Sequence, residues 1–221
     1  MLFLHGYLAD NRSFSYQYPF FSNNFEIFAP DLKGFGQNGK MDFPYSLDDY
    51  CDEVVKFIKD NRLKRPHVIA HSFGGRIAVK LAALNPDLFG KIVLTGAAGL
   101  KPRPSVKKTV KRLAFKAVKP FIKKQKLEWF YSSDYRALSP VMRQSFVKIV
   151  NEHLDTLAGK ITNQTLVING KDDKETPPYF ARRYNRLIKN SRLILIWGAG
   201  HFCFIDKPIK FNTEVKEFLL S

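Results

Sequence analysis

Ser72 is the residue whose sequence surroundings point most clearly to chemistry. An apolar run, Val68-Ile69-Ala70, leads up to it, and small residues stand two positions before and after it, at Ala70 and Gly74. A helical pattern of apolar residues begins directly afterwards. This order predicts a buried strand, a very tight turn and a helix, with the serine side chain held out at the carboxyl end of the strand. A turn of the same residues without any chemistry is the alternative at this point.

An aspartate and a histidine follow later strands in the same way. Asp172 and Asp173 come after the apolar run 166–168, and His201 comes after the last apolar run. Because functional groups gather at the carboxyl ends of parallel strands, we expect these side chains to meet Ser72. A serine hydroxyl needs a base that accepts its proton, and histidine suits that work near neutral pH. A carboxylate would orient the histidine ring, so the sequence predicts a Ser-Asp-His triad that needs no cofactor.

Acyl chemistry at a serine also needs donors for the oxyanion. The backbone N–H of Phe73, the residue after the serine, is the first candidate. The turn after the first predicted strand, His5-Gly6-Tyr7, is the second source, and we expect Tyr7 to supply that N–H.

The elements that must position these groups alternate along the chain. Near-continuous apolar runs predict buried strands, and runs with helical spacing separate them, so we expect a mostly parallel sheet with helices on both faces. The predicted strands are 1–4, 25–29, 67–69, 91–95, 165–170 and 192–197, and the predicted helices are 47–58, 76–84, 178–188 and 207–220. Ser46, with Asp49 three residues on, should cap the helix that starts at 47. No strand signal appears between 100 and 160, which predicts a core of 1–99 and 161–221 with a helical cap insertion at 100–160.

Composition is that of a globular protein, with 45% hydrophobic and 25% charged residues among 221. No apolar run is long enough to cross a membrane, and the first residues do not resemble a signal peptide. Two cysteines, Cys51 and Cys203, are too few for a disulfide framework, so a cytoplasmic location with reduced thiols is expected. The sequence has no metal-ligand spacing and no phosphate-binding glycine loop.

Positive charge is concentrated in the predicted insertion. The formal net charge is +16, and residues 101–126 hold eleven Lys or Arg and no Asp or Glu. Apolar residues recur between the basic ones near helical spacing, which predicts a basic amphipathic helix. It could be a cap helix with a solvated outer face, a peripheral contact with anionic membrane, or an electrostatic guide for an acidic or lipid-like acyl substrate. Nucleic acid is the least expected partner, because stacking aromatics and known motifs are missing.

Together these segments resemble the α/β-hydrolase fold superfamily, in the order that the family has them. The matching segments are 4–7, 30–36, 70–75, 169–173 with Pro177, and 200–202. The resemblance implies that Asp173, rather than Asp172, is the triad acid, because Gly170 and Pro177 frame it as the family loop does. It also implies that the insertion covers the site and selects the substrate. The family usually has two strands before the first predicted strand, so we expect a sheet that lacks them, with 25–29 as its exposed edge.

Two functional hypotheses follow. The first is a serine hydrolase acting on a carboxylic ester or a similar acyl bond, with thioester and carbon–carbon bonds as further targets of the same triad. The second is a non-catalytic module on the same fold that binds anionic lipid or a protein partner through the basic insertion. Four other residues that could do chemistry are expected to be structural: His5 and Asp31 in turns, His71 beside the serine, and Cys203 in the core.

Overall fold

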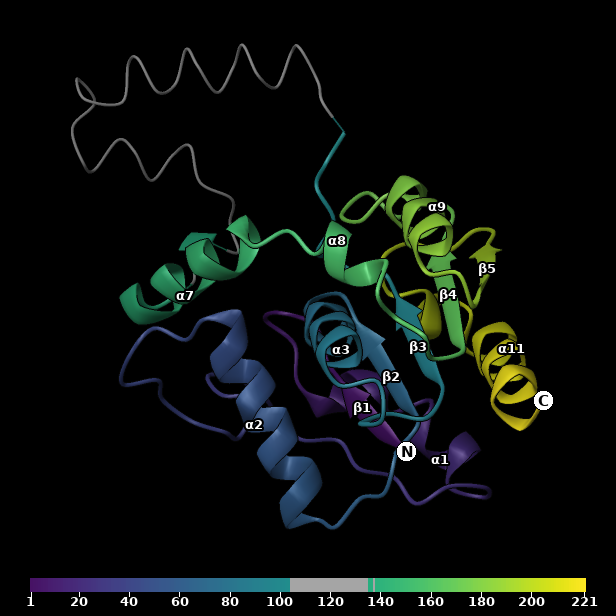
Figure 1. Cartoon of the computed structure of the whole chain (residues 1–221), viewed down its shortest axis with the longest axis horizontal. Helices are drawn as coiled ribbons and strands as arrows, with labels where there is room; N and C mark the ends of the chain where they lie inside the picture. The colour runs from purple at the N-terminus through teal and green to yellow at the C-terminus, as the bar shows by residue number, and fades with distance from the viewer. Residues whose placement is uncertain (104–134, 137) are drawn as a thin grey trace.

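A five-stranded parallel sheet lies at the centre of the molecule (Figure 1). The computed structural model describes residues 1–103, 135–136 and 138–221. The strands stand side by side in the order in which the chain makes them, and each pairs in parallel with the next. They are β1 (Leu2–Leu4), β2 (Val68–His71), β3 (Ile92–Thr95), β4 (Thr165–Gly170) and β5 (Ser191–Ile196). The predicted α/β architecture is confirmed.

Helices cover both faces of this sheet. One face carries α2 (Leu47–Asp60), α3 (Phe73–Leu84), α8 (Asp155–Ala158) and α9 (Pro178–Leu187). The other face carries η1 (Asn11–Phe14), α1 (Tyr18–Phe21), α10 (Cys203–Asp206) and α11 (Pro208–Leu220). The predicted capping box of α2 is confirmed, since the Ser46 hydroxyl accepts from the Asp49 N–H and the Asp49 carboxylate accepts from the Ser46 N–H.

The direction in which the chain crosses the sheet explains this division. From β1 to β5 every crossover moves the same way along the sheet, and crossovers between parallel strands are almost always right-handed. Helices α2, α3, α8 and α9, which lie within those crossovers, therefore share one face. The segment after β1 instead moves outward to Phe28, beyond the edge of β1, so η1 and α1 fall on the opposite face.

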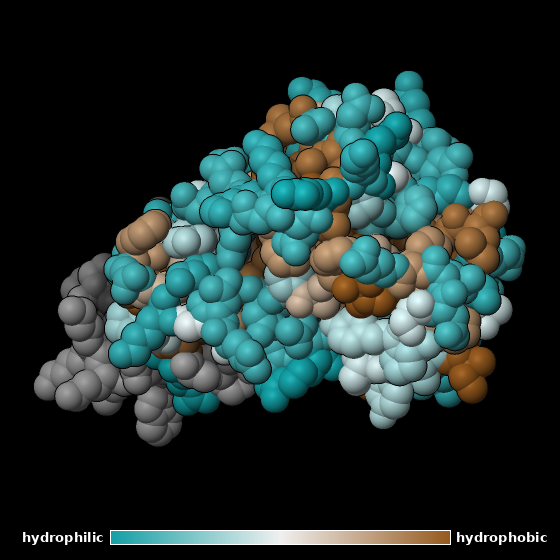
Figure 2. Space-filling view, turned by 90° about the horizontal axis from the view of Figure 1, so that it is seen from below, coloured by the Kyte–Doolittle hydropathy of each residue, from teal (hydrophilic) through white to brown (hydrophobic). Residues whose placement is uncertain are grey.

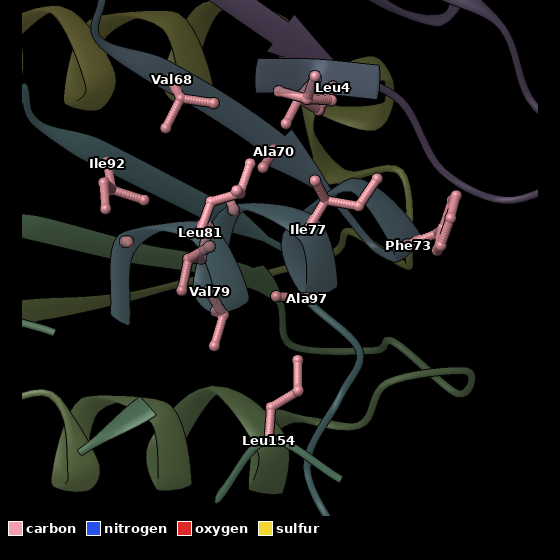
Figure 3. Close-up of a cluster of buried hydrophobic side chains, with 14 of the residues drawn as sticks. Leu4, Val68, Ala70, Phe73, Ile77, Val79, Leu81, Ile92, Ala97 and Leu154 are labelled. Atoms are coloured by element: carbon pink, nitrogen blue, oxygen red, sulfur yellow. The ribbon is translucent and has the colours of Figure 1, made fainter. Parts of the chain in front are cut away.

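Two hydrophobic cores fill the space between sheet and helices. The larger one lies beneath α3, where Val68 and Ala70 of β2 face Ile77 of α3 (Figure 3). The smaller one lies beneath α11 and is rich in phenylalanine. Strands that are buried on both faces explain why the strand sequences are apolar without alternation.

The segment predicted as a strand at 25–29 is shorter than expected. It makes one isolated parallel bridge, between Leu2 and Phe28, and the Phe28 N–H and carbonyl bond to the carbonyl of Met1 and the N–H of Phe3. The N–H of Phe25 is taken up by the carbonyl at the end of α1, and Pro30 has no N–H to extend the ladder. The segment still forms the outer edge next to β1, as predicted.

The described part of residues 100–160 is largely helical. It includes α7 (Pro140–Asn151) and α8, whereas the basic helix predicted between residues 101 and 126 lies almost wholly outside the described residues. A cap domain at 100–160 stays a prediction. Of the helices that the structure describes, none is long and apolar enough to cross a membrane. The face in Figure 2 is mainly hydrophilic and is broken by hydrophobic patches, which is ordinary for a folded domain.

Candidate active site

Ser72 sits at a strained turn between β2 and α3. Its backbone has φ 47° and ψ −104°, a conformation that residues other than glycine rarely adopt. The turn is fixed by two backbone hydrogen bonds, from the Ser72 N–H to the Thr95 carbonyl at 3.0 Å and from the Ala98 N–H to the Ser72 carbonyl at 3.1 Å. Strain of this kind costs roughly 1–3 kcal/mol, and it persists because contacts with the surrounding sheet hold the turn in this conformation.

The small residues around Ser72 are required by the close crossing of strand and helix. A Cβ on Gly74 would lie 2.3 Å from the backbone oxygen of Leu4, and a Cβ on Gly75 would lie 2.7 Å from the Ala97 Cβ. Ala70, two residues before the serine, is accommodated in the interior of β2 and is fully buried. The pattern around the serine is therefore set by packing against β1 and the loop after β3.

The loop after β4 brings Asp173 to His201. A Cβ on Gly170 would lie 2.1 Å from the Gly200 carbonyl oxygen, so only glycine allows the ends of β4 and β5 to approach this closely. The Asp172 N–H then donates to the Ala199 carbonyl at 2.9 Å and ties the two loops together. As a result, Asp173 Oδ2 lies 2.9 Å from His201 Nδ1, whereas Asp172 is exposed.

Asp173 is held as a buried carboxylate. Its Oδ1 accepts from the N–H groups of Glu175 and Thr176, both at 2.9 Å, and its Oδ2 accepts from the Thr176 hydroxyl at 2.8 Å and from Asn169. Burial by itself raises the pKa of Asp173, but the hydrogen bond and charge of His201 and the donors of Thr176 outweigh it, so the pKa lies below its ordinary value. A carboxylate held in this way can orient an imidazole and stabilise its charged form.

The second nitrogen of His201 meets another carboxylate. His201 Nε2 lies 3.3 Å from Glu175 Oε2, and the Glu175 side chain is 68% exposed. Within the described residues, Ser72 Oγ makes no hydrogen bond to His201. Such bonds are often long before substrate binds, so the geometry leaves the Ser-His pair able to form.

Two backbone N–H groups near Ser72 are available as oxyanion donors. In the part of the chain that the structure describes, neither the Phe73 N–H nor the Tyr7 N–H donates a hydrogen bond. Tyr7 also lines the pocket in front of Ser72, and Phe73 begins α3 directly after it. Both N–H groups are therefore available to an oxyanion at Ser72, and their role stays a proposal.

A pocket of about 240 Å³ opens in front of the serine and histidine. Its floor includes Gly6, Ser72 and His201, and its walls are mostly aromatic or aliphatic side chains, namely Tyr7, Leu8, Tyr135, Leu138, Phe146 and Phe202. Phe146 comes from α7, and the Tyr7 hydroxyl donates to the Met142 carbonyl of the same helix at 3.0 Å. Helix α7 thus contributes directly to the wall of the pocket.

His5, Asp31 and Cys203, which we expected to be structural, make contacts that hold turns or fill the core. His5 Nδ1 donates to the Gly6 carbonyl and its Nε2 accepts from the Leu32 N–H, while the Asp31 carboxylate accepts from the N–H groups of Asn11 and Gln37. Cys203 is fully buried beside Thr95.

His71 is buried between the serine and His201. Its Nε2 bonds to the His201 carbonyl at 3.1 Å, and its Nδ1 has no partner among the described residues. A carbonyl can only accept, so Nε2 carries a hydrogen. Burial, helped by the charge of His201, lowers the pKa of His71 to about 3.

The sequence analysis missed Glu175, Thr176 and Asn169, and it could not place Phe146. Thr176 and Asn169 are visible only as residues near Asp173, and their hydrogen bonds depend on how the loop folds. Glu175, two residues after Asp173, could have been suspected as a second acid on the same turn. No group of three or more potential metal ligands occurs in residues 1–103, 135–136 and 138–221.

Comparisons with known proteins agree with this fold. The "AB hydrolase superfamily protein YisY" of Bacillus subtilis (strain 168) is 27% identical, over 99% of this chain and 90% of the relative. The "2-hydroxy-6-oxo-2,4-heptadienoate hydrolase" of Pseudomonas putida is 24% identical, over 92% of this chain and 81% of the relative. The solved esterase (EaEST) of Exiguobacterium antarcticum superposes with a TM-score of 0.79 at 25% identity, over 100% of this chain and 91% of that one.

A sequence model described as "Alpha/beta hydrolase family" matches residues 1–214, almost the whole chain. The strained serine turn, the Asp-His pair and the parallel sheet agree with this match. The chain belongs to the alpha/beta hydrolase family.

Proposed function

We propose that this serine hydrolase of the α/β fold cleaves carboxylic esters with a small, largely apolar acyl group, using Ser72, His201 and Asp173. The observation that carries the proposal is the convergence of Ser72 and His201 on one pocket, with Asp173 buried behind the histidine at 2.9 Å. The aromatic walls and the modest volume of the pocket favour a compact, uncharged acyl group.

The geometry supports the following steps. His201 Nε2 takes the proton of the Ser72 hydroxyl as Oγ bonds to the carbonyl carbon, and the carbonyl oxygen becomes an oxyanion. The N–H groups of Phe73 and Tyr7 donate to that oxyanion. His201 then gives its proton to the departing alcohol, which leaves an acyl ester on Ser72. A water molecule attacks this ester as His201 takes its proton. His201 then returns that proton to Ser72 Oγ as the bond between Oγ and the acyl carbon breaks, and the carboxylic acid is released.

Asp173 acts through His201 and not on the substrate. Its hydrogen bond keeps the hydrogen on Nδ1, so that the lone pair of Nε2 faces the serine side of the ring. Thr176 supports this arrangement, because its hydroxyl oxygen lies 2.8 Å from Asp173 Oδ2 and 3.2 Å from His201 Nδ1, so it contacts both members of the pair. The carboxylate stabilises the imidazolium that forms when Nε2 takes the serine proton.

Hydrolysis of a carbon–carbon bond is the second candidate. The Pseudomonas putida relative is named for hydrolysing a 2-hydroxy-6-oxo-dienoate, and the identity of 24% extends over 92% of this chain. The same triad could act on either bond, so the acyl and leaving groups that the pocket accepts decide between them. The esterase, which matches 100% of this chain at 25% identity, supports the ester reading.

Labelling with a fluorophosphonate probe tests the triad without requiring the natural substrate. We expect the wild-type protein to be labelled, and Ser72→Ala and His201→Ala to lose labelling while keeping the wild-type circular dichroism spectrum. Hydrolysis of p-nitrophenyl acetate, followed in the same three proteins, should fall in parallel. A folded wild-type protein that is neither labelled nor active would contradict the proposal.

A binding module on the same fold is the remaining alternative, and the basic segment 101–126 favours it. Binding to vesicles with anionic lipid that persists in Ser72→Ala, together with no turnover of any ester, would support that function. Neutralising the lysines of the segment should then abolish the binding.

A further inference from the structure

Glu175 is a charged residue of the pocket that the proposed triad does not use. It lies on the loop that carries Asp173, and its side chain turns back toward the reacting centre. Its carboxylate oxygen is 3.3 Å from His201 Nε2, the nitrogen that must exchange a proton with Ser72. A group bound at the serine therefore has to lie within a few ångströms of this carboxylate.

The described lining of the pocket does not balance the charge of Glu175. Among the lining residues that the structure describes there is no Lys or Arg. The other lining residues with ionisable side chains are His71, His201, Tyr7 and Tyr135. Burial lowers the pKa of His71 and raises the pKa of Tyr7, which favours the neutral form of both. The neighbouring cations of the loop, Lys171 and Lys174, are outside the lining.

We propose that Glu175 determines specificity by excluding substrates that carry a negative charge close to the reacting carbonyl and by favouring neutral or cationic ones. The inference deepens the proposed ester hydrolysis and rests on it. Like charges that are brought together in a partly desolvated pocket repel, whereas a cationic group gains attraction from the carboxylate and from the faces of the aromatic walls.

The contact with His201 gives Glu175 a second effect on binding. A carboxylate only accepts hydrogen bonds, so its contact with Nε2 is attractive when that nitrogen carries a hydrogen. A cationic substituent near the reacting centre offers Glu175 another partner, whereas an anionic substituent there meets a second negative charge.

Because the Glu175 side chain is 68% exposed, water screens this charge and the expected effect is moderate. The overall charge of +16 acts in the opposite sense, since it attracts anions to the protein as a whole. A comparison of two variants that differ from the wild type by the same charge separates the local effect from this general field.

The experiment measures kcat/KM for three phenyl acetates whose meta substituent is trimethylammonium, tert-butyl or carboxylate. The first two are nearly isosteric and differ in charge. At low ionic strength, Glu175→Gln should raise kcat/KM for the carboxylate ester about tenfold relative to kcat/KM for the tert-butyl ester. The same variant should lower kcat/KM for the trimethylammonium ester severalfold. Differences in the intrinsic reactivity of the esters cancel, because each ester is compared between variant and wild type.

Asp172→Asn is the matched control. It removes one negative charge from the same loop, but Asp172 is exposed and does not line the pocket. We expect its three values to keep their wild-type ratios within about twofold. Equal shifts in both variants, or unchanged ratios in Glu175→Gln, would overturn the proposal. If the wild-type protein hydrolyses none of the esters, the proposed function has failed instead, and that outcome is distinct from an unchanged ratio.

Discussion

The floor and the roof of the pocket are built in different ways. The floor consists of Ser72 and His201, which stand at the ends of buried parallel strands and are fixed by backbone geometry. The roof includes Phe146 on α7, which reaches the core through a few side-chain contacts. The proposed chemistry is thus anchored in the sheet, whereas substrate contacts are carried by a separate helix.

The attachment of α7 depends on two buried basic residues of α3. Arg76 donates to the carbonyls of Ile149 and Glu152, both at 2.8 Å, where α7 ends. Lys80 pairs with Glu152 at 2.5 Å and with Asp48 of α2 at 2.7 Å. Cations suit the carboxyl end of a helix, where carbonyl groups have no helical partner. The roof can therefore loosen without any change in the floor, which the following variants test.

The largest effect is expected for the buried acid of the floor. Asp173→Asn should lower kcat about 10³–10⁴-fold, because the amide can no longer hold the Nδ1–H tautomer and stabilise the imidazolium. Asp172→Asn, which makes the same chemical change one residue earlier, should retain more than half of the activity. Equal losses in the two variants would show that the acid of the triad is misassigned.

The serine turn should be the next most sensitive point. Gly74→Ala places a methyl group 2.3 Å from the Leu4 carbonyl oxygen. To relieve this contact the backbone must move, because no flexible side chain can give way. We expect the free energy of unfolding to fall by about 3 kcal/mol or more, measured by urea denaturation. The control is Gly159→Ala, whose added methyl group would lie 3.6 Å from the Thr156 carbonyl oxygen, an ordinary contact distance, and this variant should be nearly neutral.

Loosening the roof should affect binding more than chemistry. Arg76→Ala leaves two carbonyls at the end of α7 without their donor, and we expect a loss of about 2 kcal/mol in stability. KM for p-nitrophenyl acetate should rise severalfold while kcat changes less. The matched control is Arg136→Ala, which removes an exposed arginine next to Tyr135 in the pocket wall. It should change neither KM nor kcat by more than about twofold. A fall in kcat at constant KM would mean that the roof and the floor are not independent.

The last expected effect is a pH dependence of stability that comes from His71. Its pKa is about 3 in the folded protein and about 6.5 in the unfolded chain. Between these values the unfolded chain binds the additional proton, so stability falls as the pH drops from about 6.5 toward 3, by up to about 1.4 kcal/mol per pH unit.

His71→Gln should remove that part of the slope, because an amide can donate to the His201 carbonyl but does not titrate. Urea denaturation of both proteins at pH 7.5, 6 and 5 measures the difference. Parallel curves would show that His71 does not remain neutral in the folded state.

Particular residues show how far the sequence could lead. The capping box of Ser46 and Asp49, the serine turn and the glycine at 170 are local signals, because each depends on the backbone within a few residues. Together with the apolar runs, signals of this kind located the five strands of the described sheet. The strand predicted at 25–29 was too long, because the hydrogen bonds of its first residue go to α1, which no local pattern indicates.

The sequence by itself determined the order of strands and helices and the residue types at the strand ends. Apolar periodicity and tight turns depend on residues that are neighbours in the chain. The tertiary structure shows which groups meet. It places Asp173 on His201, as the resemblance implied, and it alone reveals Glu175 at the opposite nitrogen and Phe146 in the pocket of the serine. Asp173 and His201 lie 28 positions apart in the chain, and the distances in all of these contacts follow from how β4, β5 and α7 pack, which no single stretch of sequence contains.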